Sequence, residues 1–454
     1  VPPPPPPRGG RAPALLGVAA GGAHDRARPR NVVLIGIDSL RWDRLGCYGA
    51  RREISPHIDE LAASGCRFER AYTSAPWTMP AVATVLTGQY PSMHGVIRPE
   101  HALSDDTQTL AEILSDAGYS TSGVISNRLV GERAGFAQGF ERFHEGHAID
   151  HAYISTEGVT DVAVEELRRL AGEERPFLLF AFYFDPHYDY HDHDEIDFAA
   201  PAAGRLTGQE KIHQLRALPD MTDEELGFLR DRYDEEIRYT DAGIGRLLAT
   251  LDELGRRDDT LVVLVSDHGE AFYEHGWLGH VRDLYEELVR VPMIIRDPSA
   301  PAPFVATDPV SIAAITPTVV EALGLGQVGA GFQTSSVLPQ VHGRAMELLD
   351  PVFFEVDFVP LSRANAGKEA HKIGIVHADR KLIRDLKNGT AEHYRLSNDP
   401  DERNDLGEAE NGAVLFEALD LHQRMIATGG LTAETLEFSD EELETLRDLG
   451  YAGD

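Results

Sequence analysis

The fold class follows from the stretch NVVLIGID, residues 31–38, in which an apolar run ends at an aspartate. A short, unbroken apolar run of this kind predicts a parallel strand that is buried on both faces. Four later runs have the same character, and we predict strands from them at 120–125 (STSGVI), 176–184 (PFLLFAFYF), 260–265 (TLVVLV) and 291–295 (VPMII).

Helical patterns lie between these runs, and we predict helices at 58–64, 81–86, 110–117, 159–170 and 224–254. Strands that alternate with helices indicate an α/β fold with a central, mostly parallel sheet flanked by helices. In such sheets the reactive groups lie beyond the carboxyl ends of the strands. Asp38, Asp185 and Asp267 each occupy such an end, which is the first indication of function.

The pattern changes near residue 345. Shorter strands are predicted at 352–356, 372–377 and 381–385, and a helix is predicted near 413–427. The segment 439–450 predicts a terminal helix with a serine cap and a glycine at its end. We therefore expect a large α/β domain over residues 31–345 and a small C-terminal α+β subdomain over residues 346–454.

Residues 1–30 precede this pattern. They combine a proline run at 2–7, the basic residues Arg8 and Arg11, and a short apolar stretch at 12–20. This composition predicts a disordered segment or a processed leader, and a leader would favour a periplasmic or secreted location. The chain has no run of 18 apolar residues, so we predict no membrane span.

Charge and cysteine content limit the partners and the kinds of site. The chain has 454 residues and a formal net charge of −33. An acidic surface repels phosphate backbones, so we expect no nucleic acid partner. The two cysteines, Cys47 and Cys66, cannot form a disulfide framework or a thiolate metal cage. A metal site would therefore draw on carboxylates and imidazoles.

Four segments carry the candidate chemistry: 36–41 (GIDSLR), 74–91 (SAPWTMPAVATVLTGQYP), 184–191 (FDPHYDYH) and 266–280 (SDHGEAFYEHGWLGH). Asp38, Asp267 and His268 supply two carboxylates and an imidazole from two strand ends, a suitable set for one divalent cation. An enzyme that cleaves an anionic ester must neutralise an ester oxygen, activate a nucleophile and help the leaving group depart.

Thr78 stands at the mouth of the helix that is predicted to run through Ala81. A threonine at this position can be a simple helix cap. A helix N-terminus also attracts anions, so the cap and a nucleophile can be the same residue.

Together these residues resemble the sulfatase family of the alkaline phosphatase superfamily. The likeness spans roughly residues 31–451 and includes 45–49 (LGCYG), 55–62 (SPHIDELA), 86–91 (LTGQYP), 284–287 (LYEE), 290–292 (RVP) and 394–400 (YRLSNDP). The resemblance implies an alkaline-phosphatase-like fold and Thr78 as the nucleophile. It also implies one divalent metal ion (Ca, Mg, Mn or Zn), which Asp38, Asp267, His268 and the Thr78 oxygen would hold.

The chain departs from the family pattern at the nucleophile. The family carries a Cys/Ser-x-Pro-x-Arg signature, whose first residue becomes formylglycine, whereas this chain has Thr78, Pro80 and Val82. Threonine cannot give that aldehyde, so we expect no formylglycine. The usual Asp-Asp opening is also reduced to Asp38-Ser39. A threonine nucleophile with one aspartate and an Asp-His pair resembles the sites of the phosphoesterase relatives: nucleotide pyrophosphatase/phosphodiesterases, phosphoethanolamine transferases and lipoteichoic acid synthases.

The resemblance also suggests supporting residues. We expect His187 to contact the transferred group and His280 to approach the leaving oxygen, with Arg282 as the alternative. Asn127 either donates to an ester oxygen or caps a turn. A polar cluster either holds a second metal ion or is a solvated loop: Asp189, His191, Asp192, His193 and Asp194.

The leading hypothesis is cleavage of a phosphate ester, by hydrolysis or by transfer to another alcohol, through a covalent intermediate on Thr78. The alternatives are a sulfatase that uses Thr78 directly and a non-catalytic, sulfatase-like binding protein. The expected substrate is a small-molecule, glycan-linked or lipid-linked anionic ester. The segments expected to contact it, 144–151 and 189–218, have no readable pattern.

Overall fold

The computed structural model describes residues 28–147, 155–193, 195–200, 202–218, 220–326, 331–346, 350–359, 369–407, 412–431 and 433–448. The predicted leader therefore lies outside the described residues, except for residues 28–30. Among the described helices, none is long and apolar enough to cross a membrane.

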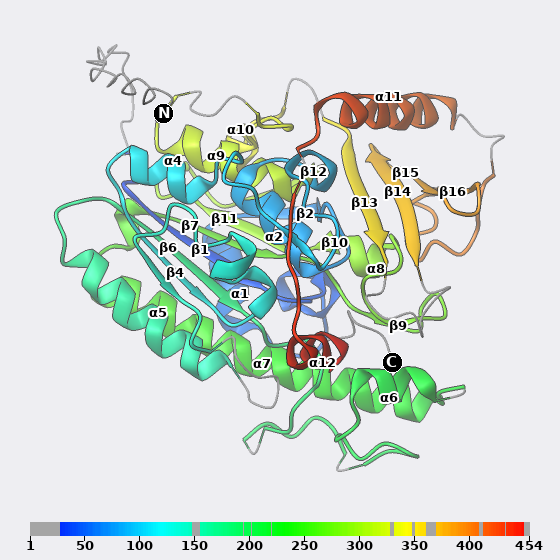
Figure 1. Ribbon diagram of the computed structural model, residues 1–454. Helices are drawn as coiled ribbons and strands as arrows, with labels where there is room; N and C mark the ends of the chain where they lie inside the picture. The colour runs from blue at the N-terminus through cyan, green and yellow to red at the C-terminus, as the bar shows by residue number, and fades with distance from the viewer. Residues whose placement is uncertain are drawn as a thin grey trace, which may run out of the picture.

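A nine-stranded sheet forms the centre of the molecule (Figure 1). Its strands follow the order β10-β2-β11-β7-β1-β6-β4-β5, and β12 lies beside β2. The strands are β1 Asn31–Ile37, β2 Cys66–Tyr72, β4 Ser120–Ile125, β5 Arg142–His144, β6 Phe177–Tyr183, β7 Thr260–Ser266, β10 Arg290–Val291, β11 Met293–Arg296 and β12 Phe304–Ser311.

Most of the neighbouring strands in this sheet are parallel, as predicted. The strands from β7 through β1, β6 and β4 to β5 all run in one direction. The predicted strand at 291–295 is in fact two strands, β10 and β11, which flank Pro292 and run antiparallel to β2. The sequence did not predict β2, because Arg67, Glu69 and Arg70 interrupt its apolar pattern.

Helices cover both faces of the sheet (Figure 1), and each predicted helix is present with bounds within three residues of the prediction. On one face lie α2 Thr78–Thr87, α4 Leu110–Asp116 and α9 Ile315–Ala322, and on the other lie α1 Pro56–Ser64, α5 Thr156–Ala171 and α7 Asp223–Glu253. Shorter elements are α3 Pro91–His94, α6 Ile212–Ala217, α8 Glu286–Val289, α10 Leu338–Val341, β3 His101–Ala102, β8 Ala271–Phe272 and β9 Leu278–Gly279.

Strand β1 explains why the sheet is covered on both sides. Every residue of β1 is buried. Val32 and Leu34 pack in the core that includes α2, α4 and α9, whereas Val33, Ile35 and Ile37 pack in the core that includes α1, α5 and α7. Successive side chains of a strand point to opposite faces, so a strand that is apolar at every position needs an apolar layer on each side.

A second sheet has four antiparallel strands, β13 Val352–Phe358, β14 Ala370–His377, β15 Arg380–Asp385 and β16 Thr390–Arg395. One side of β13 packs into the main core through Val352, Phe354 and Val356. On the other side of the sheet, α11 Ala413–Gly429 packs its Leu415 and Leu419 against β14 and β15. The predicted domain boundary at 345/346 falls between the two sheets in the sequence. Because one apolar core includes residues of both sheets, the division into two domains stays a prediction.

The chain then leaves the second sheet and adds a strand to a separate two-stranded sheet (Figure 1). Strand β17 Glu434–Thr435 pairs with β3, and α12 Asp440–Asp448 follows. The predicted serine cap is present, since Ser439 Oγ accepts a hydrogen bond from the backbone N–H of Glu442 at 3.3 Å. The predicted glycine end lies outside the described residues.

A buried lysine joins the second sheet to the first. Lys381 of β15 is fully buried, and its Nζ lies 3.1 Å from Glu286 Oε1 and 2.8 Å from Glu402 Oε1. Glu286 belongs to α8, and Tyr72 of β2 donates to its second oxygen at 3.2 Å. Both carboxylates are themselves buried, so one ammonium group neutralises charge from two parts of the fold.

We predict that Lys381→Met destabilises the protein by about 3–5 kcal/mol, because it leaves two carboxylates buried without their cation. Urea unfolding followed by circular dichroism measures the change. Lys387→Met is the matched control, since Lys387 forms an exposed ion pair with Glu369 and its loss costs about 1 kcal/mol or less. Equal, small changes in both variants would show that the buried group contributes no more than a surface pair.

Candidate active site

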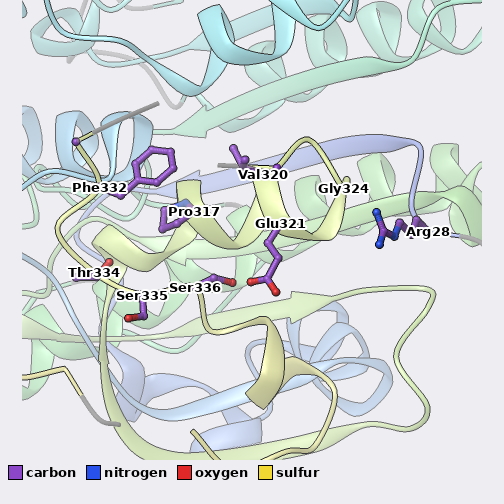
Figure 2. A pocket seen from close by; sticks show the side chains of 11 residues that line it. Arg28, Pro317, Val320, Glu321, Gly324, Phe332, Thr334, Ser335 and Ser336 are labelled. Atoms are coloured by element: carbon purple, nitrogen blue, oxygen red, sulfur yellow. The ribbon is translucent and has the colours of Figure 1, made fainter. Parts of the chain in front are cut away.

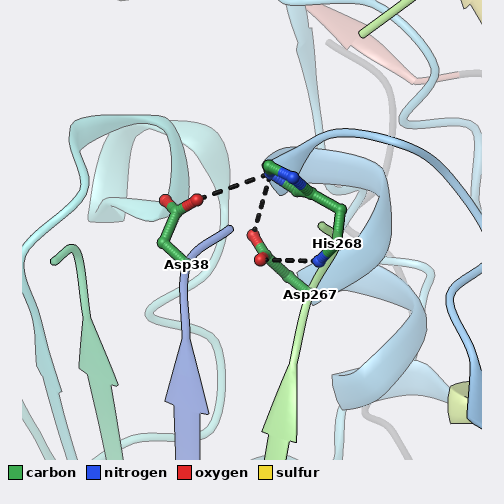
Figure 3. A group of neighbouring side chains, drawn as sticks. All are labelled: Asp38, Asp267 and His268. Atoms are coloured by element: carbon green, nitrogen blue, oxygen red, sulfur yellow. Dashed lines mark hydrogen bonds and ion pairs between the residues drawn. The ribbon is translucent and has the colours of Figure 1, made fainter. Parts of the chain in front are cut away.

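The site lies at the carboxyl ends of β1 and β7, where Asp38 follows one strand and Asp267 and His268 follow the other. His268 Nε2 lies 3.4 Å from Asp38 Oδ1 and 3.5 Å from Asp267 Oδ2, as Figure 3 shows. One ligand atom from each residue lies within 4.8 Å of the other two. Within the described ranges this is the group of His, Cys, Asp and Glu side chains that is arranged to hold a metal ion.

Hydrogen bonds fix the orientation of these three side chains. The backbone N–H groups of Ser39 and His268 both donate to Asp267 Oδ1, at 3.1 Å and 2.7 Å, which leaves Oδ2 turned toward His268. Ser39 reaches this position with a φ of 58°, a left-handed conformation that is unusual for serine. His268 Nδ1 lies 2.8 Å from the carbonyl of Gly269, so Nδ1 carries the proton and Nε2 presents a lone pair to the carboxylates.

The electrostatics of the group fit a cation. Burial raises the pKa of Asp38 to about 8 despite hydrogen bonds from Asn127 and Ser39. Burial and the nearby Asp38 raise the pKa of Asp267 well above its ordinary value, and burial lowers the pKa of His268. Asp267 Oδ2 is buried and has no hydrogen-bond partner among the described residues. Two adjacent buried carboxylates are costly without a positive charge, and a divalent cation would supply it.

Thr78 lies against this group. Its Oγ1 is 3.4 Å from Asp38 Oδ2 and 3.3 Å from His268 Nε2. The helix α2 begins at Thr78 itself, and Trp77 is the N-cap residue. The alternative interpretation, in which Thr78 is a simple helix cap, is therefore not supported. Its buried hydroxyl lies beside the candidate metal ligands at a helix N-terminus, and its role as the nucleophile stays a prediction.

Asn127 follows β4 and uses both ends of its amide within the protein. Its Nδ2 donates to Asp38 Oδ2 at 2.8 Å, and its Oδ1 accepts from the backbone N–H of Leu129 at 2.9 Å. The turn-capping interpretation is thus correct, and the side chain also holds Asp38 in place. A contact between Asn127 and an ester oxygen stays a prediction.

His187 and His280 approach the group from two loops. Their ring centroids are 4.9 Å apart, and the His280 ring lies 4.4 Å from that of His268. Glu270 Oε1 lies 3.2 Å from His280 Nδ1, and His280 Nε2 lies 3.5 Å from the Tyr188 hydroxyl. Burial and then the charge of Arg216 lower the pKa of His280 well below 6.5. The structure therefore brings both predicted histidines to the metal-ligand group.

Arg282 contacts Trp277 in the structure. Its guanidinium stacks over the Trp277 ring, with Cζ 4.7 Å from the ring centroid. Its expected role at the leaving oxygen stays a prediction.

The predicted second metal cluster has other partners. Lys211 Nζ lies 2.5 Å from Asp189 Oδ2, Arg232 forms an ion pair with Asp192, and His193 Nε2 lies 3.0 Å from Glu236 Oε2. The backbone N–H of His191 donates to Glu236, and Asp194 lies outside the described residues. In the part of the chain that the structure describes, these side chains do not form a metal-ligand group, because cations and a helix carboxylate already bind them.

Sequence reasoning gave no role to four residues of the site: Ser39, Tyr188, Arg216 and Glu270. Ser39, Tyr188 and Glu270 lie inside the quoted motifs, so their position next to a candidate site residue could have marked them as part of the site. Arg216 comes from α6, inside the segment 189–218 that was expected to contact the substrate, but nothing in the local sequence marks this particular residue.

A separate cavity lies beside α9 (Figure 2). It has a volume of about 910 Å³, and it is lined by Arg28, Pro317, Val320, Glu321, Gly324, Gly326, Gly331, Phe332 and residues 334–336. It includes none of the residues of the metal-ligand group, and its lining carries one acidic and one basic side chain. The cavity therefore does not belong to the candidate active site.

Comparison with known proteins identifies the family. The family model described as sulfatase matches residues 30–325, which is well over half of the chain. The chain belongs to the sulfatase family. A choline-sulfatase of Rhizobium meliloti (strain 1021) is 26% identical over 429 residues, covering 82% of this chain and 83% of the relative.

Solved structures share the fold of this family member. A structure determined in complex with its substrate D-glucosamine-2-N,6-O-disulfate has a TM-score of 0.74, with 21% identity over 88% of this chain and 98% of that chain. The phosphonate monoester hydrolase of Agrobacterium radiobacter has a TM-score of 0.73, with 22% identity over 91% of this chain and 99% of that chain. The fold is thus alkaline-phosphatase-like, and the protein is a sulfatase-family hydrolase of anionic esters, a family that generally binds a metal ion.

We predict that Asp267→Ala removes a tightly bound divalent metal ion, because Asp267 Oδ2 is a buried carboxylate oxygen of the metal-ligand group and has no hydrogen-bond partner among the described residues. Elemental analysis of the purified protein should give close to one metal ion per chain before the substitution and far less after it. Glu166→Gln is the matched control, since Glu166 is a buried carboxylate that binds Arg169 and Ser122 instead. Full metal occupancy in Asp267→Ala would remove Asp267 from the ligand set.

Proposed function

We propose that the protein cleaves phosphate-based esters with Thr78 as the nucleophile. The observation that supports this most directly is the position of the Thr78 hydroxyl, 3.4 Å from Asp38 Oδ2 and 3.3 Å from His268 Nε2 at the N-terminus of α2. The hydroxyl faces the candidate metal ligands, and the helix begins without needing it as a cap.

Asp38, Asp267, His268 and the Thr78 oxygen would hold one divalent cation. When bound, the cation supplies positive charge that polarises an ester oxygen and favours ionisation of the hydroxyl. The first-turn N–H groups of α2 and the helix dipole add positive potential at the same place. The resulting pocket favours a reacting group that carries more than one negative charge.

The first step forms a covalent bond between Thr78 and phosphorus. Thr78 Oγ1 attacks phosphorus, and its proton passes to an acceptor, for which Asp38 Oδ2 is within reach. The bond between phosphorus and the leaving oxygen breaks, and that oxygen takes its electron pair and a proton. In the second step, water or another alcohol attacks phosphorus, the bond between phosphorus and Thr78 Oγ1 breaks, and the proton of the attacking hydroxyl passes to the threonine oxygen. Water gives hydrolysis, and an alcohol gives transfer.

Two histidines serve the transferred and leaving groups in this proposal. His187 contacts an oxygen of the transferred group. His280 donates the proton to the leaving oxygen, with its ring oriented by Glu270 at 3.2 Å. Burial and Arg216 lower the pKa of His280, and the negative charge of the incoming ester acts in the opposite direction and favours the protonated ring.

Phosphate is preferred over sulfate for two reasons. A phosphate monoester carries a larger negative charge than a sulfate ester, so the cation and the helix N-terminus stabilise it more strongly. Threonine also lacks the route to the aldehyde on which the family's sulfate chemistry relies.

A sulfatase that uses Thr78 directly is the second candidate. It is favoured by the choline-sulfatase relative, which matches this chain over most of its length. A non-catalytic binding protein is less favoured, because Thr78, Asp38, Asp267, His268 and His187 are all present and buried together.

We predict that phosphate esters and phosphonate esters are turned over faster than sulfate esters. A panel of aryl phosphate, aryl phosphodiester, aryl phosphonate and aryl sulfate, each with the same leaving phenol and several added divalent metals, tests this directly through kcat/KM. A clear preference for the sulfate would establish the second candidate, and no turnover of any ester would favour the non-catalytic alternative.

We predict that Thr78→Ala lowers kcat by about a thousandfold or more while Thr78→Ser keeps part of the activity, because only serine retains the attacking oxygen. Peptide mass mapping should find unmodified threonine at rest, and rapid quenching should trap phosphothreonine. Thr250→Ala is the matched control, since Thr250 is a helical threonine whose hydroxyl donates to the carbonyl of Arg246 at 2.9 Å. A folded Thr78→Ala variant with near-normal turnover would exclude the mechanism.

A further inference from the structure

Arg216 is a basic residue of α6 whose guanidinium is held beside the catalytic histidines. Its Nε donates to the carbonyl of Leu278 at 2.9 Å. Its Cζ lies 4.8 Å from the centroid of the Trp277 ring and 5.7 Å from that of the Tyr188 ring. One hydrogen bond and contacts with two aromatic rings therefore hold the planar guanidinium in place. That hydrogen bond uses the N–H of Nε and leaves the N–H groups of Nη1 and Nη2 for other partners.

The Nη2 atom of Arg216 is buried and makes no hydrogen bond within the described residues. Among the described residues Arg216 forms no ion pair with a carboxylate, although its charge opposes the rise that burial causes in the pKa of Glu270. Buried donors are nearly always satisfied, so an unsatisfied donor on a charged group points to a ligand.

Gly279 makes room for this guanidinium. A Cβ atom at Gly279 would lie 2.2 Å from Nη2, and the glycine has a φ of +91°, which other residues rarely adopt. The Nη2 atom thus lies directly against the backbone next to His280. The glycine permits the approach of the guanidinium to the histidine, and a larger residue would displace it.

The position of Arg216 relative to the site defines which part of a substrate it can meet. The Tyr188 and His280 rings stack with centroids 5.0 Å apart, and His280 in turn lies 4.4 Å from His268. Arg216 is therefore separated from the metal ligands by the Tyr188–His280 pair. If His280 protonates the leaving oxygen, the leaving alcohol departs on the side where Arg216 lies.

We propose that Arg216 binds a second anionic group, carried by the leaving alcohol, and so selects esters whose alcohol bears a carboxylate, phosphate or sulfate. The proposal rests on the proposed function for its assignment of the leaving side, but not for the choice between phosphate and sulfate as the reacting group. A guanidinium binds such oxyanions through two parallel hydrogen bonds, and a charge-assisted bond of this kind is about twice as strong as a neutral one.

The test compares two substrates that differ in one charge. The probes are 3-carboxyphenyl phosphate and 3-carbamoylphenyl phosphate, together with the two corresponding sulfates. The measured quantity is the ratio of kcat/KM for the charged probe to kcat/KM for the neutral probe, taken in whichever series is turned over. We expect a ratio of about ten or more for the unmodified chain, since a charge-assisted hydrogen bond in a protein contributes roughly a tenfold effect or more.

Variants of Arg216 separate recognition from structural support. Arg216→Met should reduce the ratio to about one, whereas Arg216→Lys should keep part of the preference. Arg230→Met is the matched control, because Arg230 also donates to a backbone carbonyl, that of Phe272, and lies over its ring. The control should keep the full ratio.

A ratio near one in the unmodified chain would overturn the proposal without any variant, even if Arg216→Met failed to fold. Equal losses for both probes in Arg216→Met would also overturn it and make the residue a structural support. A sulfate preference with an Arg216-dependent ratio would contradict the proposed phosphate chemistry and leave this inference intact.

Discussion

The parallel register of β1 and β7 is the constraint on which the site depends. Ile37 pairs with Ser266, so Asp38 and Asp267 leave the sheet at the same level. The ladder continues into both residues, because Asp38 N donates to the carbonyl of Tyr183 at 2.9 Å and Asp267 N donates to that of Ile37 at 3.3 Å. A slip of one residue would turn each carboxylate to the other face of the sheet. The two buried cores, which fix the orientation of β1, therefore also fix the ligands.

Charge burial distinguishes this site from an ordinary polar cluster. Elsewhere in the described structure, buried acids such as Glu166 and Glu286 have a basic partner within 4 Å. Asp38 and Asp267 instead share His268 as their ion-pair partner among the described residues, with Nε2 at 3.4 Å from Asp38 Oδ1 and 3.5 Å from Asp267 Oδ2. Such an arrangement stores unfavourable electrostatic energy that a bound cation relieves, so occupancy of the site and stability of the fold are linked.

The sequence predicted the parts of the fold and site that depend on local pattern. The strand NVVLIGI and its final aspartate were predictable because burial on both faces demands an unbroken apolar run. Strand β2 was not, because it exposes charged side chains on one side. Thr78 was predicted as the nucleophile with a simple helix cap as the alternative, since both roles favour the same residue type near a helix start, and the N-cap residue is instead Trp77. Arg216 lies in the segment 189–218 that was expected to contact the substrate, but the residue itself was not singled out, because its position depends on contacts with the Leu278 carbonyl and the Trp277 ring that no local pattern encodes.

The buried group formed by Lys381, Glu286 and Glu402 also bears on how this protein can be recombined with its relatives. A chimera that takes its second sheet from another family member replaces Lys381 and Glu402 with the donor's residues opposite Glu286. Unless the donor segment brings both a cation and a carboxylate at matching positions, the junction will bury an unbalanced charge. Exchange of the C-terminal segment therefore requires three residues from two distant parts of the chain to change together.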